Sequence, residues 1–249
     1  MTSTNKLLLE AKGITKYFGT ITALENVNLK VHEGECLGVV GDNGAGKSTL
    51  MKVLSGLYKP SAGALFFEGK EHVLDSPKDS QNLGLEMVYQ DLALAGNLPI
   101  GENIFLGREP TKNIGFLKFL DFKKIQEMTS AHLEKLKINV KSAEQKVEEL
   151  SGGQRQAVAI ARSTAFNAKV VIMDEPTAAL AIKEVGKVLD LINKLKNTGV
   201  GVIVISHRMD DIFTVCDRVM ALFQGTNFAE SQLDKTSRDE VIGWIMGKK

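Results

Sequence analysis

Residues 41–48 read Gly-Asp-Asn-Gly-Ala-Gly-Lys-Ser and directly follow the apolar run Cys-Leu-Gly-Val-Val at residues 36–40. A glycine-rich stretch that ends in a lysine and a hydroxyl residue is the phosphate-loop pattern. The apolar run predicts a buried strand, and the apolar spacing over residues 49–57 predicts a helix. A plain glycine turn between strand and helix is the less favoured interpretation, because it does not account for the lysine and the hydroxyl.

The phosphate loop (residues 41–48) has a direct chemical interpretation. Its glycines allow backbone N–H groups to turn inward around phosphates, and the helix that follows adds the positive end of its dipole. Lys47 can reach the β and γ phosphates, and Ser48 can hold Mg²⁺. The residues predicted here to bind nucleotide are Gly41, Asp42, Asn43, Gly44, Ala45, Gly46, Lys47, Ser48 and Thr49.

Two carboxylates, Asp174 and Glu175, follow the apolar run Val-Val-Ile-Met at residues 170–173. Open α/β sheets place their active sites at the carboxyl ends of such strands. Because successive strand residues point to opposite sides, the two acids are expected to have different roles. Asp174 fits a Mg²⁺ ligand, directly or through water, and Glu175 fits the general base. Alone, the pair would be interpreted as a helix cap or a solvated turn.

His207 and Gln90 end two further apolar runs, at residues 200–205 and 85–89. His207 is predicted to contact the γ phosphate and orient the attacking water. Gln90 is predicted to ligate Mg²⁺ or its water and to act as a hinge that senses the γ phosphate. The alternative for His207 is a structural histidine, and the alternative for Gln90 is an ordinary polar residue at a strand end. The remaining histidines, for which the structural role is preferred, are His32, His72 and His132.

Residues 150–154 read Leu-Ser-Gly-Gly-Gln and open a predicted helix rich in small residues. The first N–H groups of such a helix are free to receive an anion. A second anion site on a chain that already has a phosphate loop makes sense if two copies pair head to tail. Each copy would then place Ser151, Gly152, Gly153 and Gln154 on the nucleotide of the other. A glycine-rich helix cap is the alternative.

The bulk composition excludes several classes. The 31 basic and 30 acidic residues nearly cancel, so no nucleic-acid partner is predicted. No apolar run has the length of a membrane span or a signal peptide, so a membrane role would come through a separate subunit. Cys36 and Cys216 lack metal-ligand spacing and are expected to be free thiols.

The pattern of apolar residues predicts one α/β domain. The parallel core strands are expected at residues 35–40, 170–173 and 200–205, with a helix at 183–196. Alternation at residues 7–9, 21–31 and 65–68 predicts an antiparallel sheet at the N-terminal edge. A helical insert without strands is expected over about 97–165, with a helix from near Asp121, and a capping box at Ser237 and Glu240 opens a final helix. The domain is divided into a core with its β lobe, about 1–90 and 166–249, and a helical subdomain, about 91–165.

These motifs resemble the ABC (ATP-binding cassette) ATPases across essentially the whole chain. The resemblance implies a P-loop NTPase (RecA-like) core, an N-terminal antiparallel β subdomain and a helical insert that carries the signature segment (residues 150–154). It matches Phe18 to the aromatic that stacks on adenine, with Tyr17 less favoured, Gln90 to the Q-loop glutamine and His207 to the switch histidine. It also implies ATP and Mg²⁺ as ligands, and two cassettes that close around two ATP molecules.

Finer details are similar to the importers of ribose, xylose and fructose. These details are the identities of the residues in the phosphate loop and in segments 88–94, 103–109 and 176–180. The single-cassette fructose type is the nearest match. The resemblance implies a homodimer at the cytoplasmic face of the membrane, integral permease subunits and, indirectly, a periplasmic or extracellular sugar-binding protein.

One position departs from the family. Ala181 stands where most members have an aspartate that contacts the opposite subunit. Two alternatives stay open beside the importer: a soluble ABC ATPase with a non-membrane partner and, motivated by Ala181, an ATP-switched dimerising module with weak turnover. The first would require long basic or coiled-coil insertions, which the sequence does not show.

Overall fold

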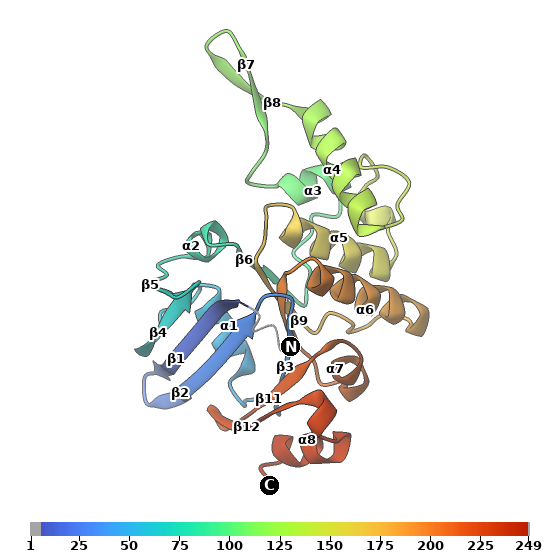
Figure 1. Cartoon of the computed structure of the whole chain (residues 1–249). Helices are drawn as coiled ribbons and strands as arrows, with labels where there is room; N and C mark the ends of the chain where they lie inside the picture. The colour runs from blue at the N-terminus through green and yellow to red at the C-terminus, as the bar shows by residue number, and fades with distance from the viewer. Residues whose placement is uncertain (1–5, 249) are drawn as a thin grey trace.

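The computed structural model describes residues 6–248 as two sheets with helices between and around them, and one projecting hairpin (Figure 1). The strands are β1 (Leu7–Phe18), β2 (Ile21–His32), β3 (Cys36–Val40), β4 (Ala62–Phe67), β5 (Lys70–His72), β6 (Leu85–Val88), β7 (Thr111–Ile114), β8 (Leu117–Leu120), β9 (Val170–Asp174), β10 (Gly201–Ile205), β11 (Arg218–Phe223) and β12 (Thr226–Gln232). The helices are α1 (Lys47–Leu54), α2 (Pro77–Asn82), α3 (Ile100–Phe105), α4 (Phe122–Leu136), α5 (Gly152–Thr164), α6 (Ile182–Asn197), α7 (Met209–Val215) and α8 (Arg238–Ile245), with short 3₁₀ turns at Val147–Glu149 and Leu233–Lys235.

The core is a six-stranded sheet in the order β12-β11-β3-β10-β9-β6. Every pair in it is parallel except β11 with β12 at the edge. Its central strands are buried on both faces, which is why they are continuous branched-apolar runs. Along β9, Val171 and Met173 enter one hydrophobic cluster, whereas Val170 and Ile172 enter the other. The predicted α/β class is confirmed.

The antiparallel sheet has the order β2-β1-β4-β5 and covers one face of the core. Helix α1 contributes Leu50, Met51, Val53 and Leu54 to the hydrophobic cluster shared by the two sheets. It ends at Leu54, earlier than the predicted residue 57, because the chain turns at Ser55 and at Gly56, whose φ is +74°. The phosphate loop is therefore held between two layers.

The opposite face of the core sheet is covered by α5, α6 and α7, and α3 packs against α4 and α5 farther from the sheet (Figure 1). Helix α4 begins at the predicted position, where the Asp121 carboxylate accepts a hydrogen bond from the Lys124 N–H group at 3.2 Å. Helix α8 has only half of the predicted capping box. Ser237 accepts from the Glu240 N–H group, but the Glu240 side chain accepts from the Thr236 hydroxyl instead.

The expectation that residues 97–165 contain no strands is wrong. Strands β7 and β8 form a hairpin that turns at Gly115, where φ is +64°, and it projects from the helical part of the molecule (Figure 1). Its apolar side chains include the exposed residues Phe116, Leu117, Phe119 and Leu120. Such a short exposed hairpin has no buried face, so it leaves no clear periodicity in the sequence.

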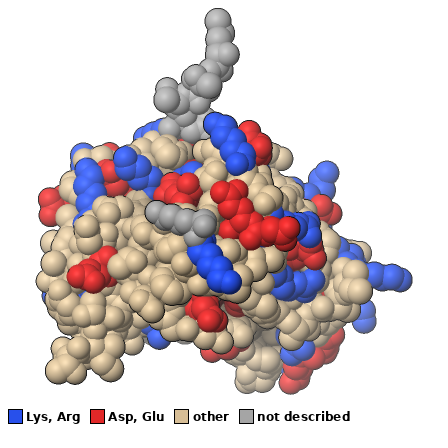
Figure 2. Space-filling view, turned by 90° about the horizontal axis from the view of Figure 1, so that it is seen from below, with Lys and Arg blue, Asp and Glu red and all other residues tan. Residues whose placement is uncertain are grey.

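The surface has no dominant sign of charge on the face seen in Figure 2, where basic and acidic side chains are interspersed. This distribution matches the near balance of charges in the composition. Within residues 6–248, none of the helices has both the length and the apolar character needed to span a bilayer.

Candidate functional site

The strand register brings the predicted site segments to one edge of the core sheet. Ile205 of β10 pairs with both Asp174 of β9 and Val39 of β3. On the far side of β9, Met173 pairs with Val88. Since these strands are parallel, the segments that follow them, with the phosphate loop, Glu175, His207 and Gln90, all leave the sheet at its carboxyl edge.

The phosphate loop is closely packed against β2. Gly46 has a φ of +101°, and a Cβ there would lie 2.8 Å from the carbonyl oxygen of Ala23. Only glycine fits this position without displacing backbone. Lys47 begins α1, so the N–H groups of the first helical turn face the loop as an anion site requires.

Lys47 crosses its own loop. Its ammonium group donates to the carbonyl oxygens of Gly41 at 2.8 Å and Asp42 at 2.9 Å. Burial lowers the pKa of Lys47, and the charges of Glu175, Asp42 and Asp174 oppose that shift. The lysine is therefore a desolvated cation beside acidic groups, which suits it to a phosphate.

Asp174 and Glu175 differ in environment. Burial, followed by the charge of Glu175, raises the pKa of Asp174, while Lys47 and Lys52 oppose the rise. Asp174 is the last residue of β9, but Glu175 lies beyond the strand in the left-handed region, with φ at +49°. Only Asp174 belongs to the strand, so the strand alternation assumed from the sequence does not apply to this pair. Such strained backbone is typical of functional sites.

Glu175 is paired with His207. Its Oε1 atom lies 2.9 Å from His207 Nδ1 and accepts from the His207 N–H group at 3.2 Å. Its Oε2 atom is buried and has no hydrogen-bond partner among residues 6–248. The His207 side chain is 73% exposed. One carboxylate oxygen is therefore occupied by the histidine, and the other is available for a water molecule.

A buried link connects the segments that carry these two residues. The hydroxyl of Thr177 donates to the Asp211 carboxylate, and both residues are fully buried or nearly so. Thr177 follows Glu175 in the chain, and Asp211 lies in α7 just after His207. This contact holds the two strand ends together, and it was not predicted from the sequence.

The oxygen donors for Mg²⁺ come from separate elements. Ser48 lies in α1, Asp174 ends β9, and Gln90 is exposed just after β6. A hydroxyl, a carboxylate and an amide oxygen suit Mg²⁺, which takes few protein ligands when phosphates supply the rest. A cation would also relieve the repulsion that raises the pKa of Asp174. The residues therefore fit the ion. Among the described residues, no group of three or more His, Cys, Asp or Glu side chains is arranged so that it could hold a metal ion.

Phe18 ends β1 and is 41% exposed. Its ring makes an edge contact with Tyr58 at a centroid distance of 5.3 Å, and the Lys16 ammonium lies 5.3 Å from its centroid. Tyr17 is also exposed. Tyr58, which supports the Phe18 ring, was not predicted from the sequence, because nothing near it in the chain marks the contact.

A helix begins at the predicted position, and Ser151 is the N-cap of this helix, α5. Its hydroxyl accepts from the Gln154 N–H group, and the Gln154 side chain accepts from the Ser151 N–H group in return. The same hydroxyl donates to Glu184 at 2.7 Å. Gly152 and Gly153 form the first turn. The sequence did not indicate Glu184, although it stands three residues after a helix cap, where glutamates often act.

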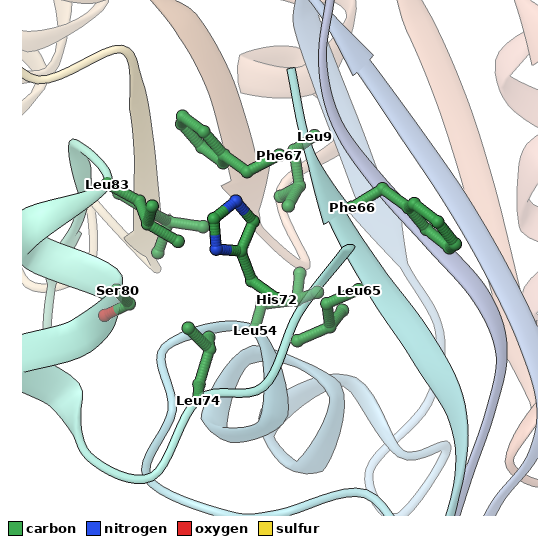
Figure 3. Close-up of a pocket in the computed structure, with 10 residues that line it drawn as sticks. Leu9, Leu54, Leu65, Phe66, Phe67, His72, Leu74, Ser80 and Leu83 are labelled. Carbon is green, nitrogen blue, oxygen red and sulfur yellow. The ribbon is translucent and has the colours of Figure 1, made fainter. Parts of the chain in front are cut away.

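The other histidines lie outside this site. His32 contacts Glu35 at 2.8 Å, and His132 lies 2.9 Å from the Ala161 carbonyl oxygen. His72 borders a small cavity of about 10 Å³ under the antiparallel sheet, among leucine and phenylalanine side chains (Figure 3). That cavity has room for no more than one water molecule, so it is a packing gap.

Known proteins share this arrangement. A family model described as "ABC transporter" matches residues 24–178, more than half of the chain. The chain is 46% identical over 234 residues to the xylose/arabinose import ATP-binding protein of Sulfolobus acidocaldarius, covering 94% of this chain and 92% of that protein. It is 37% identical to the ribose import ATP-binding protein of Caldanaerobacter subterraneus subsp. tengcongensis, where 97% of this chain covers 48% of the relative. It therefore spans nearly all of one relative and about half the length of the other.

Solved structures agree with the sequence comparison. A nucleotide-free ATP-binding cassette from an ABC transporter superposes with a TM-score of 0.81 at 28% identity, covering 96% of this chain and 95% of that one. A cassette solved as a dimer in a post-hydrolysis state with ADP and Pi gives a TM-score of 0.74 at 28% identity, covering 91% and 99%.

Proposed function

Because the chain belongs to the ABC transporter family and is an ATPase of that family, we propose that it energises the import of a monosaccharide through a separate membrane permease. Its predicted family and P-loop NTPase fold are both confirmed by the comparisons. The sugar class is supported by the xylose/arabinose and ribose import proteins to which the chain is similar. The observation that carries the hydrolytic role is the Glu175 to His207 pair beside the phosphate loop.

The phosphate loop would bind the ATP phosphates. The N–H groups at the start of α1 face the phosphates, and Lys47 exchanges its contacts with Gly41 and Asp42 for the β and γ phosphates. Phe18, supported by Tyr58, offers a half-exposed ring for the adenine. Bound Mg²⁺, held by Ser48, Asp174 and Gln90, would neutralise charge on the phosphates.

Glu175 is placed to act as the general base. Its Oε2 atom can accept a proton from water, because Oε1 is held by His207. His207 fixes the orientation of the carboxylate and is exposed enough to reach a γ phosphate. The water would attack the γ phosphorus as its proton moves to Glu175, and ADP would leave.

Two copies would complete each site. The Ser151 hydroxyl and the first N–H groups of α5 form an anion site away from the phosphate loop of the same chain. Head-to-tail pairing of two identical copies would place this helix start on the γ phosphate of the partner. The dimeric cassette bound to ADP and Pi supports such an assembly.

A depression next to Gln90 is a suitable docking place for the permease. It has a volume of about 180 Å³ and is lined by Met87, Tyr89, Leu106, Arg108, Arg162 and Phe166. Arg108 bridges Glu86 at 2.8 Å and stacks on the Phe166 ring at 4.6 Å. A short helix of a permease that contacts Tyr89 would be coupled to Gln90 and so to the bound nucleotide. This would hold the chain at the cytoplasmic face of the membrane.

The Glu175→Gln variant tests this function. It should bind ATP with unchanged affinity, form a dimer with ATP on size-exclusion chromatography and lose at least about 100-fold in Mg²⁺-dependent phosphate release, since one general base contributes roughly 10²- to 10⁴-fold. If the native chain with its permease releases phosphate no faster than Glu175→Gln does, the hydrolytic role is refuted. A variant that stays monomeric with ATP would refute the paired site.

Ala181 motivates a second candidate, a dimerising module with weak turnover. It is the N-cap of α6, and its side chain makes no capping hydrogen bond. A native chain that dimerises with ATP and releases phosphate in single-turnover conditions no faster than Glu175→Gln would favour this module over the importer.

A further inference from the structure

Glu184 lies against the signature segment of its own chain. It stands in the first turn of α6, and its Oε1 atom accepts a hydrogen bond from the Ser151 hydroxyl at 2.7 Å. Backbone N–H groups of Gly153 and Ala181 also interact with this carboxylate. The Ser151 bond, then these two groups, lower the pKa of Glu184, so the side chain is an anion at neutral pH.

The close approach of Glu184 depends on Gly153. A Cβ at Gly153 would lie 2.8 Å from the Glu184 Cβ and 2.9 Å from its Cδ. These distances are shorter than van der Waals contact, so a larger residue would force the carboxylate away. The glycine therefore gives the Glu184 side chain access to the N-terminal end of α5.

The groups held by Glu184 are those that an incoming phosphate requires. A γ phosphate at the start of α5 would accept hydrogen bonds from the Ser151 hydroxyl and from the N–H groups of Gly152 and Gly153 in the first turn. The Ser151 hydroxyl has one proton, and in the single chain that proton is donated to Glu184. Two anions cannot share this donor, and at close range they also repel each other.

The Glu184 side chain has space into which it can move. An open cleft of about 560 Å³ adjoins the signature segment and is lined by Ser151, Gly153, Glu184, Lys187, Asp190 and Lys194, among others. Lys187 lies one helical turn after Glu184 and already attracts its charge. Glu184 can thus exchange Ser151 for Lys187 without any movement of the α6 backbone.

We propose that Glu184 occupies the phosphate site of the signature segment in the separate chain and is displaced by the partner's ATP when two copies close. Glu184 thereby sets the ATP concentration at which the dimer forms. This role rests on the head-to-tail pairing proposed above, and Ser151 is the residue through which it acts.

The test compares variants at Glu184 in the Glu175→Gln background, in which hydrolysis does not consume the dimer. The dimer fraction is measured by light scattering as ATP and Mg²⁺ are titrated into the full chain. Glu184→Gln keeps the shape and removes the charge, and Glu184→Ala removes both. Each should reduce the ATP concentration for half-dimerisation by roughly threefold to fivefold, as a like-charge repulsion at about 4 Å in water implies. Asp190→Asn is the matched control, because it removes the same charge from the same helix and cleft, and it should leave the midpoint unchanged.

The outcomes separate this role from a structural one and from the proposed function. The role of Glu184 is overturned if the ATP concentration for half-dimerisation stays unchanged or rises in both Glu184 variants. If Glu184 only ordered Ser151, its removal would weaken closure of the dimer, so that concentration would rise. Binding of a fluorescent ATP analogue to the monomer should not change, because Glu184 does not contact its own phosphate loop. If Glu175→Gln itself remains monomeric at saturating ATP, the paired site fails and the inference falls with it.

Discussion

Glu175 combines three features that rarely occur together at one residue. Its backbone is in the left-handed region, one carboxylate oxygen is held by His207, and the other is buried without a partner among the described residues. The left-handed backbone and the buried oxygen without a partner each cost free energy in the absence of a ligand. Together they present an oriented acceptor to a water molecule at the edge of the sheet, which is what a general base needs.

A substitution at Ala181 is expected to change the stability of the folded chain. Its backbone is extended, with φ at −65° and ψ at 150°, as a helix N-cap requires, but its methyl group cannot accept a hydrogen bond. Ala181→Asp should raise the free energy of unfolding by about 1 kcal/mol, because the carboxylate would cap α6 and interact with its dipole. Urea denaturation measures the change, with Ala181→Leu as a control that cannot cap. Equal midpoints for the three proteins would contradict the assignment of Ala181 as the cap.

At the scale of elements, the strand ends do most of the positioning. The register of β9 with β6 and β10 places Gln90, Asp174 and His207 at one edge, and the buried Thr177 to Asp211 contact braces it. The phosphate loop joins them because β3 pairs with β10. Local sequence predicts each strand end separately. The order of the strands, which makes them neighbours, comes from the packing of the sheet.

The contact between helices α4 and α5 includes a titratable side chain, His132. His132 of α4 lies 2.9 Å from the Ala161 carbonyl oxygen, and burial lowers its pKa from the ordinary value of 6.5. The unfolded chain therefore takes up this proton at a higher pH than the folded chain does. The stabilising contribution is complete above about pH 6.5 and is lost as the pH falls through the lower native pKa.

The His132→Gln variant isolates this effect. Glutamine can donate to the same carbonyl group but does not titrate, so the native chain should lose more stability than the variant between pH 7.5 and pH 5. The free energy of unfolding of both proteins is measured in urea at the two pH values. An identical loss in both would show that His132 is not the titrating group.

The helical insert shows where the sequence was insufficient. The start of α4 at Asp121 and the start of α5 at residues 151–153 were predicted because helix starts depend on residues that are close in the chain. The β7 and β8 hairpin was missed. Its alternation is short, and its side chains are exposed on both faces, so no buried stripe marks it.

For the molecule as a whole, the two hydrophobic clusters hold the fold, and none of the hairpin side chains that the structure describes belongs to either of them. Its two ends are joined at the base, where the Asp121 N–H group donates to the Pro110 carbonyl oxygen at 2.9 Å. The hairpin therefore contributes exposed apolar surface to the molecule and little to its stability.

Replacing residues 111–120 by Asn-Gly should leave the melting temperature within about 2 °C of the native value, because no core contact is lost. Calorimetry measures it, and Ile104→Ala in α3 is the control. That change removes fully buried volume, so it should cost about 2–5 kcal/mol and reduce the melting temperature clearly. If the melting temperature of the hairpin variant decreases as much as that of the control, the hairpin packs against the body of the protein.

Features that depend on neighbouring residues could be predicted from the order of amino acids alone. Glycines around Lys47, apolar runs before Asp174 and His207, and the Ser151 cap are local patterns, since turns, strands and caps follow from short-range sterics and hydrogen bonds. They were enough to identify the family and the α/β class.

The contacts between residues far apart in the chain could be seen only in the folded molecule. It places Ser151 on Glu184, the Phe18 ring on Tyr58, and the Cys36 and Cys216 sulfurs 3.5 Å apart as free thiols. Such distances are set by how the sheets and helices pack, and packing sums many weak interactions over the whole core. The competition for the signature segment depends on one of these contacts, and so it could be inferred only from the folded chain.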